Sequence, residues 1–275
     1  MDCAEQIGNY LITSEPTQLS PNLYFFENCE NNEGVCFDIL TIKETDSNLR
    51  KLRRIIDNEI KPLVNQDIVG FVKTIETGFD DATHSYYIVY EHFADNTYET
   101  LQNIDIASVI NITKGLNYFK TNNNTQKFVI SPQYVKVDNT GDAKLMFAIL
   151  YDIFADENLL DEEYLSPNAK KYLSDRTSAK PTHQDDIYAL VKTFESFIRD
   201  NYEYSNVAIT NKILSGTLEE ERTKRFSKYH ELIDLLEQLP SVNRKSYQTI
   251  KVVTQPDFFD AFQAVLNSMN KTHGC

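Results

Sequence analysis

The cysteine and histidine residues of this chain could bind a metal or act as nucleophiles, but their spacing predicts neither. Cys3, Cys29, Cys36 and Cys275 include no C-x-x-C pair, and the five histidines form no metal-ligand pattern. A zinc site needs several such ligands at short, regular spacings. So few thiols in a chain of 275 residues are typical of a reducing compartment. We therefore expect no bound metal, no disulfide scaffold and a cytoplasmic location.

The first 92 residues carry mostly strand patterns. β-branched and aromatic runs alternate with polar segments rich in turn-forming residues, and one stretch has apolar residues at helical spacing. The expected strands are 10–13, 23–26, 35–42, 68–76 and 85–92, with turns at 15–21, 27–34 and 78–83 and a helix at 49–64. These patterns predict a small antiparallel sheet with one helix.

Helical patterns dominate from residue 93 onward. Short strands are still expected at 128–130, 135–137 and 144–149, and the turn Asn139-Thr-Gly141 joins the last two as a hairpin. The polar run 121–127 reads as a loop. The expected helices are 104–120, 186–199, 206–215 and 228–239. Residues 241–275 form an extension that packs on the preceding helices or leads to a further domain.

Several segments resemble protein-kinase motifs and occur in the kinase order. Ser85-Tyr-Tyr-Ile-Val-Tyr-Glu-His92 resembles the strand that enters the hinge between two lobes, with Tyr90 as the gatekeeper and Glu91 as the first hinge residue. Other similar segments are the helix at 110–120, the catalytic loop and hairpin at 127–147, the end of the activation segment at 164–167, and the start of the central helix at 182–190.

The resemblance covers about residues 8–240 and implies the fold class. We expect a bilobal, protein-kinase-like α+β fold. Residues 1–92 would form the N-lobe, a small antiparallel sheet with one helix, and residues 93–240 the larger, mainly helical C-lobe.

The positions that perform catalysis in kinases carry other residues in this chain. Asp38 stands where the resemblance expects the phosphate-binding lysine, Val129 replaces the catalytic aspartate, and Tyr134 and Phe147 replace the two metal ligands. Residues 9–33 contain no glycine to let backbone N–H groups approach a phosphate. Because kinases act by positioning phosphates and Mg²⁺ with these groups, the resemblance implies an inactive domain without cofactor or metal.

A second alignment of the third strand leaves a nucleotide site open as an alternative. It makes Lys43 the strand lysine and Glu59 its helix partner. A bound nucleotide would then lie near Lys43, Glu59, Tyr90, Glu91 and Phe93. In the first alignment, Lys43 is a solvated residue at the end of a strand and Glu59 is a surface charge.

Four residues that match the family have structural roles. Asp186 corresponds to the aspartate that starts the central helix and holds the backbone of the catalytic loop by hydrogen bonds. Pro132 and Gly141 preserve turn geometry, and Arg225 falls where the family keeps a late arginine in the C-lobe.

The charge balance excludes two classes of partner. Lys and Arg number 27 against 41 Asp and Glu, which gives a net charge of −14. Such a surface repels nucleic acids and anionic membranes, and no apolar run approaches the length of a membrane span. The segment Arg50-Lys-Leu-Arg-Arg54 is a basic exception, either a solvated helix face or a docking surface.

Three functional hypotheses follow. The leading one is a catalytically inactive pseudokinase that serves as a scaffold or allosteric regulator for protein partners. The second is an atypical active kinase or related phosphotransferase with relocated groups, drawn from Lys43, Glu59, Asp142 and Asp152. The third is an unrelated α+β binding protein.

Overall fold

The computed structural model describes residues 6–96, 104–123 and 127–241. The contacts divide the chain into two compact units, Met1–Pro240 and Ser241–Cys275. The fold below is that of the first unit. The extension expected at 241–275 lies outside the described residues after Ser241.

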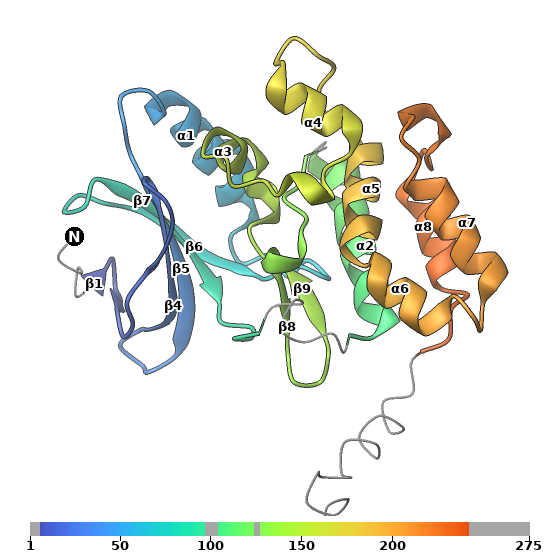
Figure 1. Ribbon diagram of the computed structural model, residues 1–275. Helices are drawn as coiled ribbons and strands as arrows, with labels where there is room; N and C mark the ends of the chain where they lie inside the picture. The colour runs from blue at the N-terminus through green and yellow to red at the C-terminus, as the bar shows by residue number, and fades with distance from the viewer. Residues whose placement is uncertain (1–5, 97–103, 124–126, 242–275) are drawn as a thin grey trace, which may run out of the picture. The chain divides into compact units, whose positions relative to one another are not determined.

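An antiparallel sheet is the main element of the described part of the first 92 residues (Figure 1). The strands lie in the order β1-β2-β4-β5-β7-β6, and β3 also pairs with β4. Side chains alternate between the two faces, so that Leu40 and Ile42 point to one side of β5 and Ile39 to the other. The strands are β1 (Gln6–Ile7), β2 (Tyr10–Leu11), β3 (Thr17–Ser20), β4 (Leu23–Glu30), β5 (Cys36–Lys43), β6 (Thr74–Asp80) and β7 (Ser85–Glu91).

One helical segment crosses this part of the chain, as its apolar spacing predicts. It begins as α1 (Leu49–Ile55), continues as a π-helical turn at Ile56–Ile60 and ends as a 3₁₀ turn at Lys61–Leu63. Its buried face contains Leu52 and Ile55. Apolar residues at three- and four-residue spacing place this face against the sheet.

The strand expected at 68–76 forms later in the chain. β6 begins at Thr74 and runs to Asp80, through part of the segment expected to turn. The preceding apolar residues pack on a helix instead, with the rings of Phe71 and Phe119 4.9 Å apart. Gly70 permits this contact, because it has φ +77° and a Cβ there would lie 2.5 Å from the backbone of Ile112.

Helices dominate the described residues beyond 104 (Figure 1). The hairpin of β8 (Val135–Val137) and β9 (Ala143–Leu145) lies among them, with 3₁₀ turns at Pro132–Tyr134, Ala148–Leu150, Glu162–Tyr164 and Arg222–Lys224. The helices are α2 (Ile106–Asn123), α3 (Tyr151–Asp156), α4 (Pro167–Ser174), α5 (His183–Thr193), α6 (Glu195–Tyr202), α7 (Val207–Thr217) and α8 (Tyr229–Leu236).

Some local predictions in this half were wrong. Residues 128–130 form no strand, because their N–H groups find other acceptors: Phe128 donates to the Asp186 side chain and Val129 to the Ala148 carbonyl. The strand expected at 144–149 ends at Leu145. The helix expected at 186–199 is two helices that meet at Phe194. Helix α2 extends to Asn123, into the expected loop, and α3 and α4 were not predicted.

A single hydrophobic cluster joins the sheet, α1 and the hairpin region. We call it the interlobe cluster, because both halves of the unit contribute to it. Its buried members are Leu23, Phe25, Leu40, Ile42, Leu52, Ile55, Ile56, Ile60, Val72, Ile88, Tyr90, Val129, Tyr134, Met146, Phe147, Leu150, Tyr151, Ile153, Phe154 and Ala155.

Candidate functional site

The three apolar or aromatic residues that the sequence resemblance places at kinase catalytic positions lie together in the interlobe cluster. Val129, Tyr134 and Phe147 are 1%, 7% and 5% exposed, respectively. The Tyr134 hydroxyl donates to the Leu159 carbonyl at 3.2 Å. None of these side chains can bind Mg²⁺ through a carboxylate oxygen, the ligand that this ion prefers.

Phe147 lies at the centre of an aromatic group. Its ring centroid is 5.1 Å from Phe25, 5.5 Å from Tyr90, 5.8 Å from Tyr134 and 5.7 Å from Phe154. These separations lie in the range that favours edge-to-face contacts. Phe147 also has φ +59°, a strained backbone conformation for a bulky residue that persists only where the surrounding packing enforces it.

Asp38 points toward hydrogen-bond donors rather than toward solvent. It is 1% exposed, and its Oδ1 lies 2.9 Å from Nδ1 of His92 and accepts the backbone N–H of Asn28 at 3.1 Å. Burial raises the pKa of Asp38, and these two hydrogen bonds offset part of that rise. A bulge in β4 positions the Asn28 donor, where Asn28 has φ +58°.

A buried lysine crosses from the hairpin to the sheet. Lys136 of β8 is 6% exposed, and its Nζ lies 2.7 Å from the carboxylate of Glu27 on β4. The same Nζ lies 5.6 Å from the ring centroid of Phe25. The Lys136–Glu27 ion pair therefore connects the two lobes next to the aromatic group.

Lys43 and Glu59, the alternative lysine and its partner, form no ion pair with each other or with any other described residue. Lys43 is the exposed last residue of β5 and alternates with Ile42, so it points away from the interlobe cluster. Glu59 lies near Asp152, and burial together with the Asp152 charge raises its pKa. Asp152 forms an ion pair with Lys127.

The turn between β3 and β4 contacts the helical half of the chain. The segment expected to turn at 15–21 instead contains strand β3, and the chain reverses at Pro21–Asn22. The Ser20 hydroxyl donates to Glu157 at 2.9 Å, and the Asn22 side-chain amide donates to both Glu157 oxygens at 2.9 and 3.2 Å. The Glu157 carboxylate thus binds the turn from the C-lobe side.

The residues expected at the hinge contact other protein groups. Glu91 accepts a hydrogen bond from the Lys73 backbone N–H at 3.1 Å and forms an ion pair with Lys144 at 2.8 Å. Nζ of Lys144 also lies 4.4 Å from the ring centroid of Phe93. The buried Tyr90 hydroxyl has no hydrogen-bond partner among the residues that the structure describes.

The cavity that borders Tyr90 and Phe147 is small. Its volume is about 30 Å³, and its lining includes Thr74, Phe71 and Leu145. That is room for about one water molecule, whereas pockets for small-molecule ligands are roughly 300–1,000 Å³.

Asp186 holds the loop that precedes Val129. Its Oδ1 accepts the Phe128 backbone N–H at 3.1 Å, and its Oδ2 accepts the Tyr229 hydroxyl at 3.3 Å. Burial raises the pKa of Asp186 well above its usual value. Pro132 begins the next 3₁₀ turn, and Gly141 has φ +82° in the β8–β9 turn.

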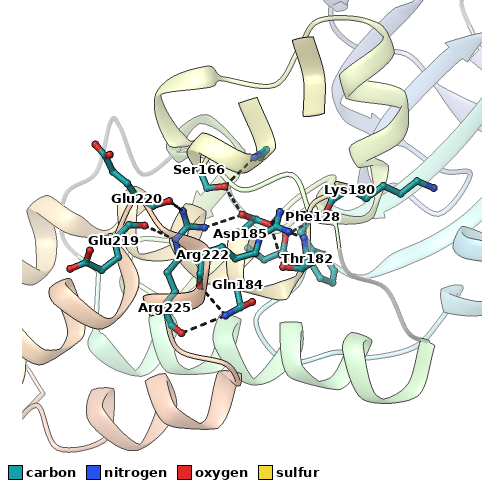
Figure 2. Close-up of polar contacts among 12 residues, drawn as sticks. Phe128, Ser166, Lys180, Thr182, Gln184, Asp185, Glu219, Glu220, Arg222 and Arg225 are labelled. Carbon is teal, nitrogen blue, oxygen red and sulfur yellow. Dashed lines mark hydrogen bonds and ion pairs between the residues drawn. The ribbon is translucent and has the colours of Figure 1, made fainter. Parts of the chain in front are cut away.

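The neighbouring Asp185 is the centre of a polar cluster that sequence reasoning missed (Figure 2). Its carboxylate lies 2.9 Å from Arg225 and 2.7 Å from Arg222, and it accepts the Ser166 hydroxyl at 2.6 Å. It also accepts the Thr182 backbone N–H at the start of α5. The only signal in the sequence was the Asp-Asp pair behind a threonine, a helix-capping pattern.

Comparison with known proteins supports the fold. No family model and no curated protein matches the sequence. A crystal structure of the Mycobacterium tuberculosis PknI kinase domain matches with a TM-score of 0.59 at 13% identity, covering 86% of this chain and 99% of that domain. A second structure of the same kinase domain matches with a TM-score of 0.57 at 13% identity, covering 84% and 95%.

The chain therefore has a bilobal, protein-kinase-like α+β fold, and the fold class predicted from the sequence is confirmed. Within the described residues, no helix is long and apolar enough to cross a membrane.

Proposed function

We propose that this chain is a pseudokinase domain, which transfers no phosphoryl group and serves as a scaffold or allosteric regulator for protein partners. The observation that carries the proposal is the position of Phe147 in the aromatic group of the interlobe cluster. Side chains from both lobes pack against one another in this cluster, and a nucleotide bound between the lobes would compete with them for space.

Two further observations support the same function. The Lys136–Glu27 ion pair and the hydrogen bonds from Ser20 and Asn22 to Glu157 connect the lobes across this region. A nucleotide between the lobes would have to break these contacts. A fold with such a filled centre can still present its surfaces to other proteins.

Nucleotide binding is tested by thermal shift with Mg-ATP and with ATP plus EDTA. A ligand that binds only the native state raises its stability by RT ln(1 + [L]/Kd), so we expect no change in Tm up to millimolar nucleotide. An active kinase domain measured alongside provides the positive control. A saturable rise in Tm with Mg-ATP would contradict the proposal.

A relocated active site is the second candidate, because Glu59, Asp152 and Lys127 approach one another. Radiolabelled ATP with a generic protein substrate tests it. We expect no transfer by the wild-type chain. Activity that Lys43→Ala or Asp152→Asn abolishes, while the fold is retained, would establish this candidate instead.

The scaffold role is tested by co-purification of the tagged chain from its native cell. We expect a protein partner to be recovered in a fixed ratio with the wild-type chain, at a yield that added Mg-ATP does not change. Release of the partner by the nucleotide would contradict the proposal.

A further inference from the structure

Two lysines and a histidine from three separate elements surround one buried tyrosine in the helical half of the chain. Lys120 is in the last turn of α2, His183 is the first residue of α5, and Lys228 directly precedes α8. The ring centroid of Tyr229 lies 6.0 Å from Nζ of Lys120 and 6.1 Å from the ring centroid of His183. We call Lys120, His183 and Lys228 the lysine–histidine cluster.

The surrounding contacts hold these three residues in place. Helices α2 and α8 pack against each other, and the Tyr229 side chain next to Lys228 is fully buried. Nε2 of His183 donates to the Ser227 carbonyl. Glu231 accepts the backbone N–H groups of Ser227 and Lys228 at 2.7 and 3.0 Å. The cluster is therefore built on fixed backbone, while Lys228 itself is exposed.

The two lysines lack a counter-charge. Among the described residues, neither Lys120 nor Lys228 forms an ion pair, in contrast to Lys114 on the same helix α2, which pairs with Glu237 at 2.8 Å. Burial and the positive charge of Lys228 lower the pKa of Lys120, and Asp186 offsets part of that fall. A chain with a net charge of −14 thus keeps two ammonium groups where they repel each other.

His183 can supply a third donor. Burial, together with the charges of Lys120 and Arg222, lowers the pKa of His183, and the Ser227 carbonyl and Asp185 oppose that fall. Because Nε2 donates to Ser227, the neutral ring carries its proton on Nε2. Nδ1 forms no hydrogen bond with the described residues. An anion at the cluster would offset the lysine charges and favour a proton on Nδ1.

We propose that the lysine–histidine cluster binds the phosphate group of a small, soluble phosphate monoester, with Lys120, Lys228 and the protonated Nδ1 of His183 as donors. A phosphate group carries about two negative charges and three strong acceptor oxygens, which match three cationic donors better than a carboxylate does. The acidic chain around the cluster repels an extended polyanion, so a small ligand is favoured. The inference goes beyond the proposed function, because none of the three residues belongs to the interlobe cluster.

Thermal shift of the full chain with phosphoserine tests the proposal, with serine at the same ionic strength as the control ligand. A ligand that binds only the native state raises Tm, so we expect a saturable rise with phosphoserine and none with serine. Lys120→Gln/Lys228→Gln should bind phosphoserine about tenfold or more weakly, because both charge-assisted donors are lost. Lys170→Gln/Lys171→Gln, the same charge change on exposed residues of α4, should respond as the wild type does.

The same variants separate loss of the site from loss of the fold. Removing one of two ammonium groups that repel each other should leave the ligand-free Tm of Lys228→Gln at or above that of the wild type. Circular dichroism establishes that each variant is folded. Because phosphate-like anions also stabilise proteins by exclusion from the surface, the difference between the Lys120→Gln/Lys228→Gln variant and the α4 control measures the site.

The pH dependence of sulfate binding tests the role of His183. Sulfate keeps its charge between about pH 8 and pH 6, whereas histidine gains a proton in this range. The anion raises the pKa of His183 from its lowered value in the free chain, so we expect sulfate to bind more tightly as the pH falls. His183→Gln keeps a donor for the Ser227 carbonyl but cannot titrate, and it should remove this dependence.

Four outcomes would overturn the proposal. The first is an equal response to phosphoserine in Lys120→Gln/Lys228→Gln and the wild type, and the second is an equal loss in the α4 control. The third is sulfate affinity that does not change with pH. The fourth is binding to phosphatidic acid vesicles without a response to phosphoserine. A rise in Tm with Mg-ATP that persists in Lys120→Gln/Lys228→Gln would contradict the proposed function alone, so the two failures are distinguishable.

Discussion

At the scale of single residues, Phe147 differs most from what a kinase needs. A metal ligand at this position must be small, charged and accessible, whereas Phe147 is buried among four aromatic rings. Its left-handed backbone conformation has a free-energy cost that the ring contacts must offset. Phe147 therefore packs at the centre of the interlobe cluster, where its ring contacts stabilise the fold.

Phe147→Asp should therefore destabilise the chain and leave it unable to bind Mg-ATP. The change removes a buried ring and places a carboxylate among apolar groups, at a cost of about 3–5 kcal/mol or more. Urea unfolding measures the loss, and Phe147→Leu should cost clearly less. A folded Phe147→Asp variant that gains Mg-ATP affinity would contradict this expectation.

Asp186 makes the stability depend on pH in a defined direction. Its folded-state pKa is raised by burial, so above the unfolded value of about 4 the native state binds more protons than the unfolded state. Stability is then greatest below that value and falls as the pH rises toward the folded-state pKa. Asp38, also raised, contributes with the same sign.

Asp186→Asn should flatten this pH dependence without removing it. The amide can still accept the Phe128 N–H, so the loop keeps its hydrogen bond. Chemical denaturation at a series of pH values measures the slope, and the exposed Asp200→Asn provides the control. An unchanged slope in Asp186→Asn would contradict the expectation.

At the scale of elements, several polar contacts connect the sheet to the helical half, and two of them involve β4 or the turn before it. The Glu157 side chain, just past α3, binds the β3–β4 turn through Ser20 and Asn22. Lys136 of β8 pairs with Glu27 of β4. Both contacts join elements far apart in the sequence, so they hold the lobes in one arrangement.

Glu157→Ala should destabilise the chain by about 1–3 kcal/mol, because it leaves partly buried donors without an acceptor. Hydrogen exchange should speed up first at the β3–β4 turn, around Asn22. The exposed Glu33→Ala is the matched control. Equal exchange in both variants would show that the contact does not hold the turn.

Within the Lys136–Glu27 ion pair, removing the Glu27 carboxylate should lower the stability of the chain more than removing the Lys136 ammonium. Glu27→Ala leaves a buried ammonium without its partner, which costs roughly 3–5 kcal/mol for a fully buried pair and less for this half-exposed one. Lys136→Met keeps the packing on Phe25 and leaves a carboxylate that is 38% exposed. Urea unfolding should therefore show a larger loss for Glu27→Ala.

At the scale of the whole molecule, the shared core predicts one unfolding transition for the two lobes. The interlobe cluster takes residues from the sheet, α1, the hairpin region and α3. Neither lobe can open without exposing the apolar surface of the other, and such burial is the main stabilising contribution. The two halves are therefore one cooperative unit.

Far-UV and near-UV circular dichroism should give coincident urea transitions, as expected for two-state unfolding. Hydrogen exchange should give similar opening free energies for β5 in the sheet and α5 in the helical half. Separate transitions would show that the interlobe cluster does not couple the lobes.

Local sequence patterns predicted the secondary structure correctly where interactions within one segment determine it. The apolar spacing at 49–64 predicted its helix, and the Asn-Thr-Gly turn predicted the β8–β9 hairpin. The same patterns failed where contacts with a segment distant in the sequence determine the secondary structure. Residues 128–130 have a strand pattern but no strand to pair with, and Ile68–Phe71 packs on α2 instead of extending β6.

The sequence by itself determined the kinase-like order of elements, and its resemblance to kinases predicts that Asp38, Val129, Tyr134 and Phe147 stand at positions of kinase catalytic residues. Both depend on the type and order of residues along the chain. Only the tertiary structure decided what occupies the space between the lobes, and that Glu157 binds the β3–β4 turn and Asp185 binds Arg225. These contacts join residues that are tens of positions or more apart, so no local pattern could show them.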